Sequence, residues 1–400
     1  MFRAQISALE DLYYNKPINY FDYASTTPIY KEVIDVMTEA MKDNFGNPSS
    51  LTATGIKAKK SIKEATETIK KAIGAQNYNL YYTSGATESN NWVAQILNEG
   101  DIVFTTPYEH PSVLKAFESR KANLIYIDFL AFDKENFIKQ LNYWRPKLVS
   151  VMGVNNETGI IPYIGEIARL CKGKALTHCD ITQTIPHCIF NCDGFGFDFY
   201  TFSGHKFGAP KGIGGLLVKP SVLKNFKPMI YGGHQQFSLR AGTESVTNII
   251  GLAKAIEKTR ELCPLFHSEF DNLNKYFKET FNKKMKEVGV DYIFVGDDNK
   301  NLLIIPEIIN VCFDRINGYT LMKMLDLAGF TVSTGSSCSA DNDYISPMLE
   351  DLQIPENYIH GSIRISLGYT TSVEEIDNLI DNIVKCVNSL KAYRESNNNE

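Results

Sequence analysis

The sequence lacks the features of a membrane-embedded or secreted protein. No apolar run approaches the roughly 20 residues that a membrane-spanning helix needs. The opening segment MFRAQISALEDLYYN has neither a basic region nor a continuous apolar stretch, so it does not resemble a secretory signal. We therefore expect a cytoplasmic protein with no membrane partner.

An excess of positive charge and a regular cysteine spacing are also lacking. The formal net charge is -5, whereas nucleic-acid surfaces need clustered Lys and Arg, so no direct nucleic-acid binding is expected. Eight cysteines without short regular spacing indicate reduced, mostly buried thiols rather than a disulfide framework. Cys188 and Cys192, with His187, have an unusual spacing for metal ligands and no second ligand pair nearby, so no metal site is predicted.

What the sequence does contain is enough apolar residues for a large core and a regular alternation of elements. Hydrophobic residues make up 44% of the 400 residues, and this length suggests two domains. From Asn79 to Ile181, β-rich runs such as NLYYT and KLVSVMGV alternate with helical patterns. This alternation predicts an α/β fold with a mostly parallel central sheet and helices on both faces. Ligands of such sheets bind at the C-terminal strand ends.

The second part of the sequence has a different pattern. A long amphipathic stretch from Val246 to Gly289 predicts a bridging helix, and strands and helices of a smaller α+β domain follow. We predict a large α/β domain at residues 16–258 and a smaller domain formed by residues 1–15 and 259–400.

A lysine at the end of an apolar strand is the strongest candidate for chemistry. The strand FYTF ends in Ser203, Gly204, His205 and Lys206, and a glycine-rich turn follows. Burial disfavours the charged form of an amine, which leaves it free to form an imine with an aldehyde. The alternative is a surface lysine beside a glycine loop.

Two further segments fit a phosphorylated aldehyde cofactor. Asp180 follows a buried strand, with Gln183 three residues later. A carboxylate near the ring nitrogen of pyridoxal phosphate (PLP) keeps the ring protonated and electron-withdrawing, although a helix N-cap is the alternative use of this aspartate. The run from Ser84 to Thr87 before a helix suits a phosphate, or an ordinary capped helix.

Cys338 differs from the other cysteines. It lies in STGSSCSADNDYISPML, a small and polar run typical of a loop, whereas Cys312 and Cys386 lie in apolar patterns. A nucleophilic thiol must be accessible and able to ionise, which a serine-rich loop allows. We predict that Cys338 is the nucleophile.

Taken in order, these segments resemble the fold-type I PLP enzymes, specifically the NifS/IscS-type cysteine desulfurases of the class-V aminotransferase family. The resemblance lies in YFDYASTTP, FGNPSS, TSGATESNN, EHPSVL, VNNETG, DITQT, SGHKFGAPKGIG, LRAGTESV, STGSSCS and SIRISLG. It implies a homodimer with the active site at the subunit interface. It also implies conversion of L-cysteine to L-alanine, with the sulfur passing to a persulfide on Cys338 and then to an acceptor protein.

The resemblance also implies roles for individual residues. Lys206 would hold PLP as an imine and, with His110, move protons. His110 would also stack on the ring, Asp180 would pair with the ring nitrogen, and Gln183 would hydrogen-bond the phenolic oxygen. Asn156 and Arg364 would orient the substrate, with Asn156 also contacting the cofactor and Arg364 binding the α-carboxylate. The phosphate would be bound by Ala86, Thr87, Ser203, His205 and, from the other subunit, Thr243.

Several alternatives stay open at this point. An aminotransferase or a selenocysteine lyase would share the fold, and a non-catalytic sulfur-relay or scaffold-binding protein would keep it without the chemistry. The sequence departs from many relatives at Ser25, Thr52 and near Tyr369. The acceptor pathway also stays open between iron-sulfur cluster biogenesis, transfer RNA thiolation and other cofactor sulfuration.

Overall fold

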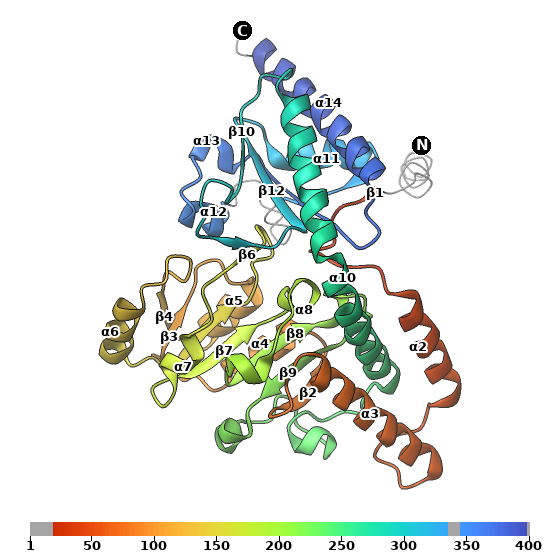
Figure 1. Cartoon of the computed structure of the whole chain (residues 1–400). Helices are drawn as coiled ribbons and strands as arrows, with labels where there is room; N and C mark the ends of the chain where they lie inside the picture. Colours follow the sequence, from red (N-terminus) through yellow and green to blue (C-terminus); the bar gives the residue numbers. More distant parts are fainter. Residues whose placement is uncertain (1–18, 335–344, 398–400) are drawn as a thin grey trace, which may run out of the picture. The chain divides into compact units, whose positions relative to one another are not determined.

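The computed structural model describes residues 19–334 and 345–397 (Figure 1). Cys338 lies outside the described residues. The chain forms two compact units: a larger one of residues 26–155 and 160–265, and a smaller one of the described residues up to Ser25, Asn156–Gly159 and the chain from Phe266 on. The domain bounds given above stay a prediction, because a compact unit need not fold independently.

The larger unit is built on a seven-stranded sheet with strand order β2-β9-β8-β7-β5-β3-β4. β9 runs antiparallel to both of its neighbours, and every other neighbouring pair is parallel. This arrangement confirms the predicted α/β class with a mostly parallel sheet. The strands are β2 (Asn79–Thr83), β3 (Ile102–Thr105), β4 (Asn123–Tyr126), β5 (Leu148–Met152), β7 (Leu176–Asp180), β8 (Phe199–Ser203) and β9 (Gly214–Val218), with a short β6 (Ile160–Ile161) outside the sheet.

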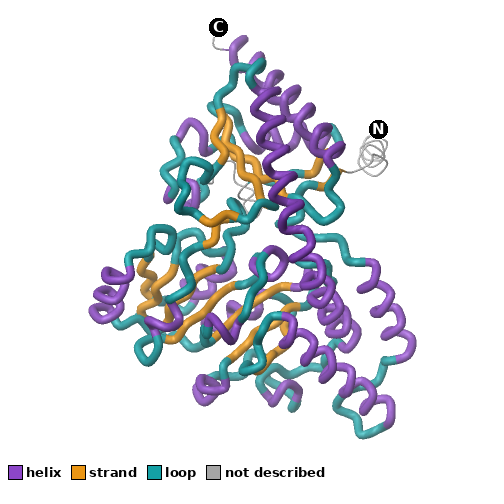
Figure 2. Tube along the Cα trace, in the orientation of Figure 1, coloured by secondary structure: helices purple, strands orange, loops and turns teal. Residues whose placement is uncertain are grey.

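Strand residues alternate between two separate hydrophobic cores, which explains why helices cover both faces of the sheet (Figure 2). Tyr82 belongs to one core and Tyr81 to the other. The helices are α2 (Lys31–Asp43), α3 (Ala53–Ala72), α4 (Ala86–Ala94), α5 (Pro111–Ser119), α6 (Lys134–Trp144), α7 (Ile167–Cys171), α8 (Thr184–His187) and α9 (Cys192–Phe195), with 3-10 turns η1 (Gly204–Lys206), η2 (Pro220–Asn225) and η3 (Gln235–Ser238).

The smaller unit contains an antiparallel sheet of β10 (Tyr292–Phe294), β12 (Ile308–Phe313) and β14 (Ser362–Ser366). A parallel pair of short strands, β1 (Asn19–Tyr20) and β13 (Phe330–Thr331), lies in the same unit. Strand β11 (Leu303–Ile304) and helices α11 (Gly318–Leu327), α12 (Pro347–Asp351), α13 (Glu356–Ile359) and α14 (Val373–Asn397) complete it. The predicted α+β character of this part of the chain is therefore correct.

The predicted bridging helix is the continuous helix α10 (Val246–Met285). Its first turns contribute Ile249 and Leu252 to the core of the larger unit, and its last turns contribute Phe277 and Phe281 to the core of the smaller one. Pro264 lies inside the helix, where it cannot donate a backbone hydrogen bond, and the boundary between the units follows it.

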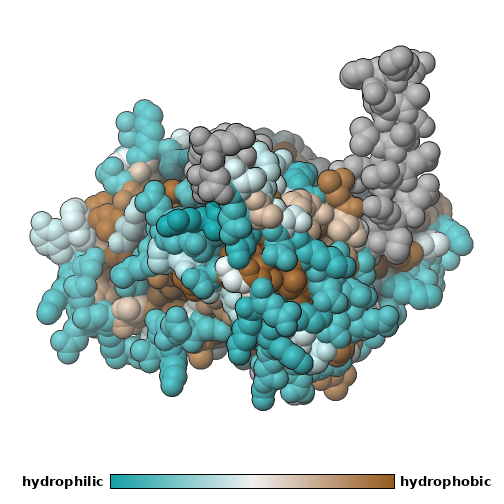
Figure 3. All heavy atoms as spheres, turned by 90° about the horizontal axis from the view of Figure 1, so that it is seen from above, coloured by the Kyte–Doolittle hydropathy of each residue, from teal (hydrophilic) through white to brown (hydrophobic). Residues whose placement is uncertain are grey.

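Hydrophilic residues cover most of the molecular face drawn in Figure 3, with hydrophobic residues in small patches between them. Among the described helices, none combines the length and the apolar character that crossing a membrane requires. The cytoplasmic location stays a prediction.

Replacing Phe277 with alanine should destabilise the smaller unit. Phe277 is fully buried in its core, and deletion of such a ring costs about 3–5 kcal/mol. Urea unfolding followed by circular dichroism measures this loss. Tyr393→Ala, at a side chain that is 69% exposed in the same unit, should change stability by less than about 0.5 kcal/mol. Equal effects of the two substitutions would contradict the assigned core.

Candidate active site

The predicted cofactor residues follow the C-terminal ends of neighbouring strands in the larger unit. Thr83 of β2 and Ser203 of β8 both pair with Gly214 of β9. The turns that follow these two strands therefore begin side by side. Asp180 is the last residue of β7, which is the neighbour of β8.

Lys206 lies in the turn η1 directly after β8 and is half-buried. The Gly204 amide donates to the Ile213 carbonyl at 3.0 Å, which fixes the start of the turn. A Cβ on Gly204 would lie 2.9 Å from both Ala209 and Leu252, so the turn requires glycine here. The lysine is thus held on a packed turn rather than on a free surface loop.

A chain of hydrogen bonds joins Asp180 to His110 through two residues that the sequence analysis did not select. The Asn90 amide nitrogen, in α4, donates to Asp180 Oδ2 at 3.0 Å and to Ser112 Oγ at 2.9 Å. Ser112 Oγ lies 2.8 Å from His110 Nδ1, and the Ser112 backbone amide donates to the same nitrogen at 3.1 Å. His110 Nδ1 is therefore an acceptor, which leaves the proton of a neutral ring on Nε2.

Burial lowers the pKa of His110, and the nearby charge of Lys206 lowers it further, while Asp180 opposes both. Burial also lowers the pKa of His205 to about 4, with Lys206 adding to the effect. His205 Nδ1 is 3.1 Å from Thr26 Oγ1. Both rings are therefore neutral at pH 7, so His110 is able to accept a proton.

Asp180 accepts a second hydrogen bond from the Thr182 amide at 3.0 Å. It does not cap a helix, because Gln183 occupies the N-cap position of α8. Gln183 itself is 5% exposed. Beside this pair, the fully buried Glu109 accepts from the Met152 amide at 2.7 Å, and burial together with the charge of Asp180 raises its pKa to about 8.

Three of the predicted phosphate residues, Ala86, Thr87 and Ser203, lie at or beside the start of α4. Gly85 precedes the helix with φ of 153°, and it has no side chain to cap the first-turn amides. A Cβ at this position would lie 3.2 Å from Ser203 Oγ. Ser203 is 7% exposed, and its hydroxyl makes no hydrogen bond within the described part of the chain. Thr87 is exposed at the same helix start, and Thr243 is exposed before α10.

These residues fit PLP. A half-buried amine and a buried carboxylate follow the neighbouring strands β8 and β7, a neutral histidine is linked to the carboxylate by hydrogen bonds, and the first amides of α4 beside the Ser203 hydroxyl suit an anion. Each group matches the chemistry of one part of the cofactor.

Arg364 and Asn156, predicted to bind substrate, lie together in the smaller unit. Arg364 Nη1 donates to the Asn156 carbonyl at 2.8 Å, and Nη2 donates to Asp22 Oδ1 and Ser25 Oγ at 2.7 Å each. The side chain is 1% exposed, and its Nε finds no partner among the described residues. Ser25 thus helps to hold the guanidinium. Thr52 has a plain structural use, as the N-cap of α3.

The described cysteines support the reading that most thiols are structural. Cys312 and Cys386 are buried, Cys192 is buried and Cys188 is half-buried. Burial raises the pKa of Cys312 to about 12 and also raises that of Cys386. No metal-binding cluster of His, Cys, Asp and Glu occurs within residues 19–334 and 345–397.

Comparison with known proteins agrees with this geometry. The chain matches the class-V aminotransferase family over residues 19–379. It is 35% identical over 383 residues to cysteine desulfurase IscS of Dictyoglomus turgidum, covering 93% of this chain and 95% of that one. A solved NifS-like protein superposes with a TM-score of 0.79 at 29% identity, covering 93% and 99% of the two chains. The structure of SspA in complex with cysteine gives a TM-score of 0.70 at 27% identity, covering 87% and 98%.

The fold and the site thus define an enzyme of the fold-type I class. The chain belongs to the class-V aminotransferase family, in its group of NifS/IscS-type cysteine desulfurases.

The buried histidine His178 should make stability depend on pH. Its ring hydrogen-bonds Ser150 at 2.8 Å and Thr201 at 3.0 Å, and burial lowers its pKa to about 4. The unfolded chain binds this proton near pH 6.5. Between these values the unfolded state holds more protons, so the free energy of unfolding should fall as the pH is lowered from about 6.5 towards 4. Urea titrations across this range measure the slope, and His178→Gln should make it shallower. An unchanged slope would refute the assignment.

Proposed function

We propose that this chain is a PLP-dependent cysteine desulfurase, which converts L-cysteine to L-alanine and transfers the sulfur through a persulfide on Cys338 to an acceptor protein. The observation that carries the proposal is that Lys206 and Asp180 follow the neighbouring strands β8 and β7, and that hydrogen bonds through Asn90 and Ser112 connect Asp180 to His110, in a fold shared with cysteine desulfurases. The solved relative SspA binds cysteine, which supports the substrate.

In this proposal the residues of the site have distinct tasks. Lys206 would hold the cofactor, and its amine or the neutral His110 would move the α-proton of the substrate. Asp180 keeps the ring nitrogen protonated, and Gln183 binds the phenolic oxygen. When bound, PLP supplies a sink for the electrons left on the substrate carbon. Asn90 and Ser112 keep the His110 ring in one orientation and tautomer.

The transfer of sulfur from the substrate to Cys338 needs no external oxidant. The Cys338 thiolate attacks the sulfur of the substrate, so an S–S bond forms while the C–S bond breaks. The electron pair of that bond stays with the substrate carbon, which takes up a proton and leaves as the methyl group of alanine. An acceptor thiolate then attacks the outer sulfur of the persulfide, which forms a new S–S bond and frees the Cys338 thiolate; in the absence of an acceptor, release as sulfide needs a reductant.

The anion site at the start of α4 is proposed to bind the phosphate of PLP, through Ala86, Thr87, Ser203 and His205. Thr243 is proposed to complete the same site in a second copy of this chain, so that the enzyme acts as a homodimer. Its exposed position supports this role. Arg364 is proposed to bind the substrate carboxylate, with Asn156 beside it. The buried Nε–H of Arg364 donates to no described residue, so it is the donor proposed for the carboxylate.

Cys338→Ser should retain bound PLP but lose alanine release from L-cysteine, because it removes only the nucleophile. In the Lys206→Ala variant, borohydride reduction should no longer attach the cofactor to the peptide that contains position 206. The measurements are alanine and sulfide production, with and without reductant, and the mass of the Cys338 peptide.

Cys188→Ser is the matched control, since it removes a half-buried thiol of the larger unit, and it should leave turnover unchanged. Alanine release by Cys338→Ser at the wild-type rate would overturn the nucleophile assignment. Faster turnover of selenocysteine than of cysteine would instead identify a selenocysteine lyase.

Arg364→Lys should raise the KM for L-cysteine by about tenfold or more, because lysine keeps the charge but has no counterpart of the Nε donor that is proposed to bind the carboxylate. Ser25→Ala removes one of the acceptors that hold Arg364 and should change KM only a few-fold. Steady-state alanine release at varied cysteine concentration measures both effects. A change in kcat with unaltered KM would count against carboxylate binding.

A further inference from the structure

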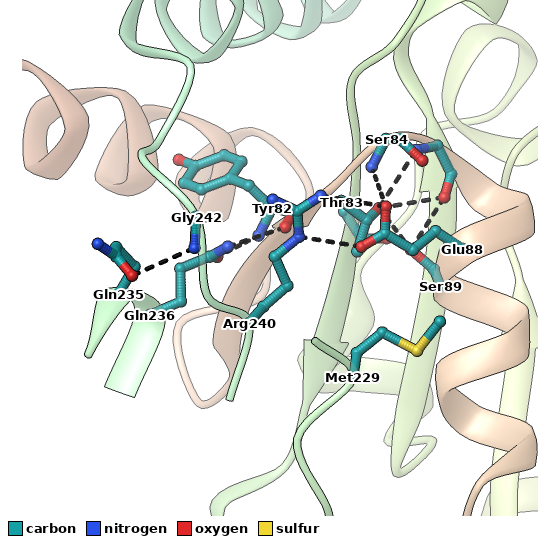
Figure 4. A network of polar contacts seen from close by, with 12 residues as sticks. Tyr82, Thr83, Ser84, Glu88, Ser89, Met229, Gln235, Gln236, Arg240 and Gly242 are labelled. Carbon is teal, nitrogen blue, oxygen red and sulfur yellow. Dashed lines mark hydrogen bonds and ion pairs between the residues drawn. The ribbon is translucent and has the colours of Figure 1, made fainter. Parts of the chain in front are cut away.

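A polar network attaches residues 235–242 to the edge strand β2 and to the start of α4 (Figure 4). The side-chain amide of Gln236 makes both backbone hydrogen bonds of Tyr82, accepting from its N–H at 2.6 Å and donating to its carbonyl at 2.9 Å. Gln235 Oε1 accepts from the Gly242 amide at 3.2 Å. The side chain of Gln236 thus pairs with the free edge of the sheet as a peptide group would.

The same segment is held in an unfavourable backbone conformation. Gln236, Phe237 and Ser238 have φ values of 47°, 61° and 62°, a region that side-chain-bearing residues rarely occupy. Residues keep such a conformation where the surrounding contacts stabilise it, and they are frequent at ligand sites. The position of the segment is therefore fixed by its contacts rather than by local preference.

Arg240, from this segment, forms an ion pair with Glu88 in the first turn of α4. Arg240 Nε donates to Glu88 Oε1 at 3.0 Å and Nη2 donates to Oε2 at 3.3 Å, with side chains that are 23% and 11% exposed. Glu88 Oε2 also accepts from the Ser84 amide at 2.8 Å. One carboxylate therefore connects Arg240 to the turn that precedes Gly85.

This carboxylate poses an electrostatic problem for the proposed phosphate site. Glu88 lies two residues after Ala86, at a helix N-terminus where a Cβ on Gly85 would lie 3.2 Å from the hydroxyl of Ser203, a residue that is 7% exposed. A helix N-terminus attracts anions, but two anions placed there repel each other. Burial alone would raise the pKa of Glu88, yet hydrogen bonds from Arg240 and Ser84 and the charge of Arg240 outweigh it and lower the pKa. Glu88 is thus an anion that needs neutralising.

We infer that Arg240 is a positioning residue for cofactor binding: by neutralising Glu88 it lets the Ser84–Gly85 turn and the first amides of α4 accept the PLP phosphate. Glu88 holds the turn in place through the Ser84 amide, and Arg240 cancels the charge that this support introduces. The inference rests on the proposed function, since it takes the phosphate of PLP as the ligand of this helix start.

The full-length chain, stripped of cofactor, is titrated with PLP and with pyridoxal, which lacks the phosphate, and binding is followed by absorbance. Arg240→Gln should weaken PLP binding about tenfold, because Glu88 is then an unpaired anion beside the phosphate. Pyridoxal binding should be unchanged. Adding Glu88→Gln to Arg240→Gln should restore PLP binding to near the wild-type level, since glutamine still accepts from Ser84 without the charge.

Lys115→Gln is the matched control, because it breaks an exposed ion pair of the same unit, with Glu118, and it should affect neither ligand. Thermal unfolding of each cofactor-free variant separates misfolding from lost binding. Equal weakening of PLP and pyridoxal, or no rescue in the double variant, would show a merely structural pair and overturn the inference. A wild-type chain that binds no PLP would overturn the proposed function and this inference with it.

Discussion

The close packing of β9 against its two neighbours is the constraint on which the site depends. A Cβ on Gly214 would lie 2.4 Å from the Phe202 carbonyl and 2.7 Å from the Gly85 Cα, so only glycine allows this approach. The contact brings the end of β2 beside the end of β8. It thereby places the start of α4 next to the turn that carries Lys206.

Burial and hydrogen bonding then give the two carboxyl groups near these strand ends, those of Asp180 and Glu109, different environments. Asp180 is held by hydrogen bonds from Asn90 and Thr182, whereas the neighbouring Glu109 is fully buried with its pKa raised to about 8. His110 is neutral because burial and Lys206 outweigh the attraction of Asp180. The neutral His110 ring is therefore able to accept a proton beside a hydrogen-bonded carboxyl group.

Most of the fold could be predicted from the sequence, because strand and helix periodicities are local. The alternation from Asn79 to Ile181 predicted β2, β3, β4, β5 and β7, and the long amphipathic stretch predicted α10. The insertion of β9 as an antiparallel strand between β2 and β8 could not be predicted in this way, because strand order depends on contacts between segments far apart in the chain.

The sequence by itself determined the residue types of the site: a lysine at a strand end, an aspartate after a strand, and small residues before a helix. Only the tertiary structure decided how they are supported. Asn90 and Ser112 between Asp180 and His110, Ser25 on Arg364, and Arg240 on Glu88 are all contacts between separate segments. These residues lie in segments that carry the family resemblance, but their contacts could not be predicted, because a polar side chain has the same sequence pattern whether it faces water or a buried partner.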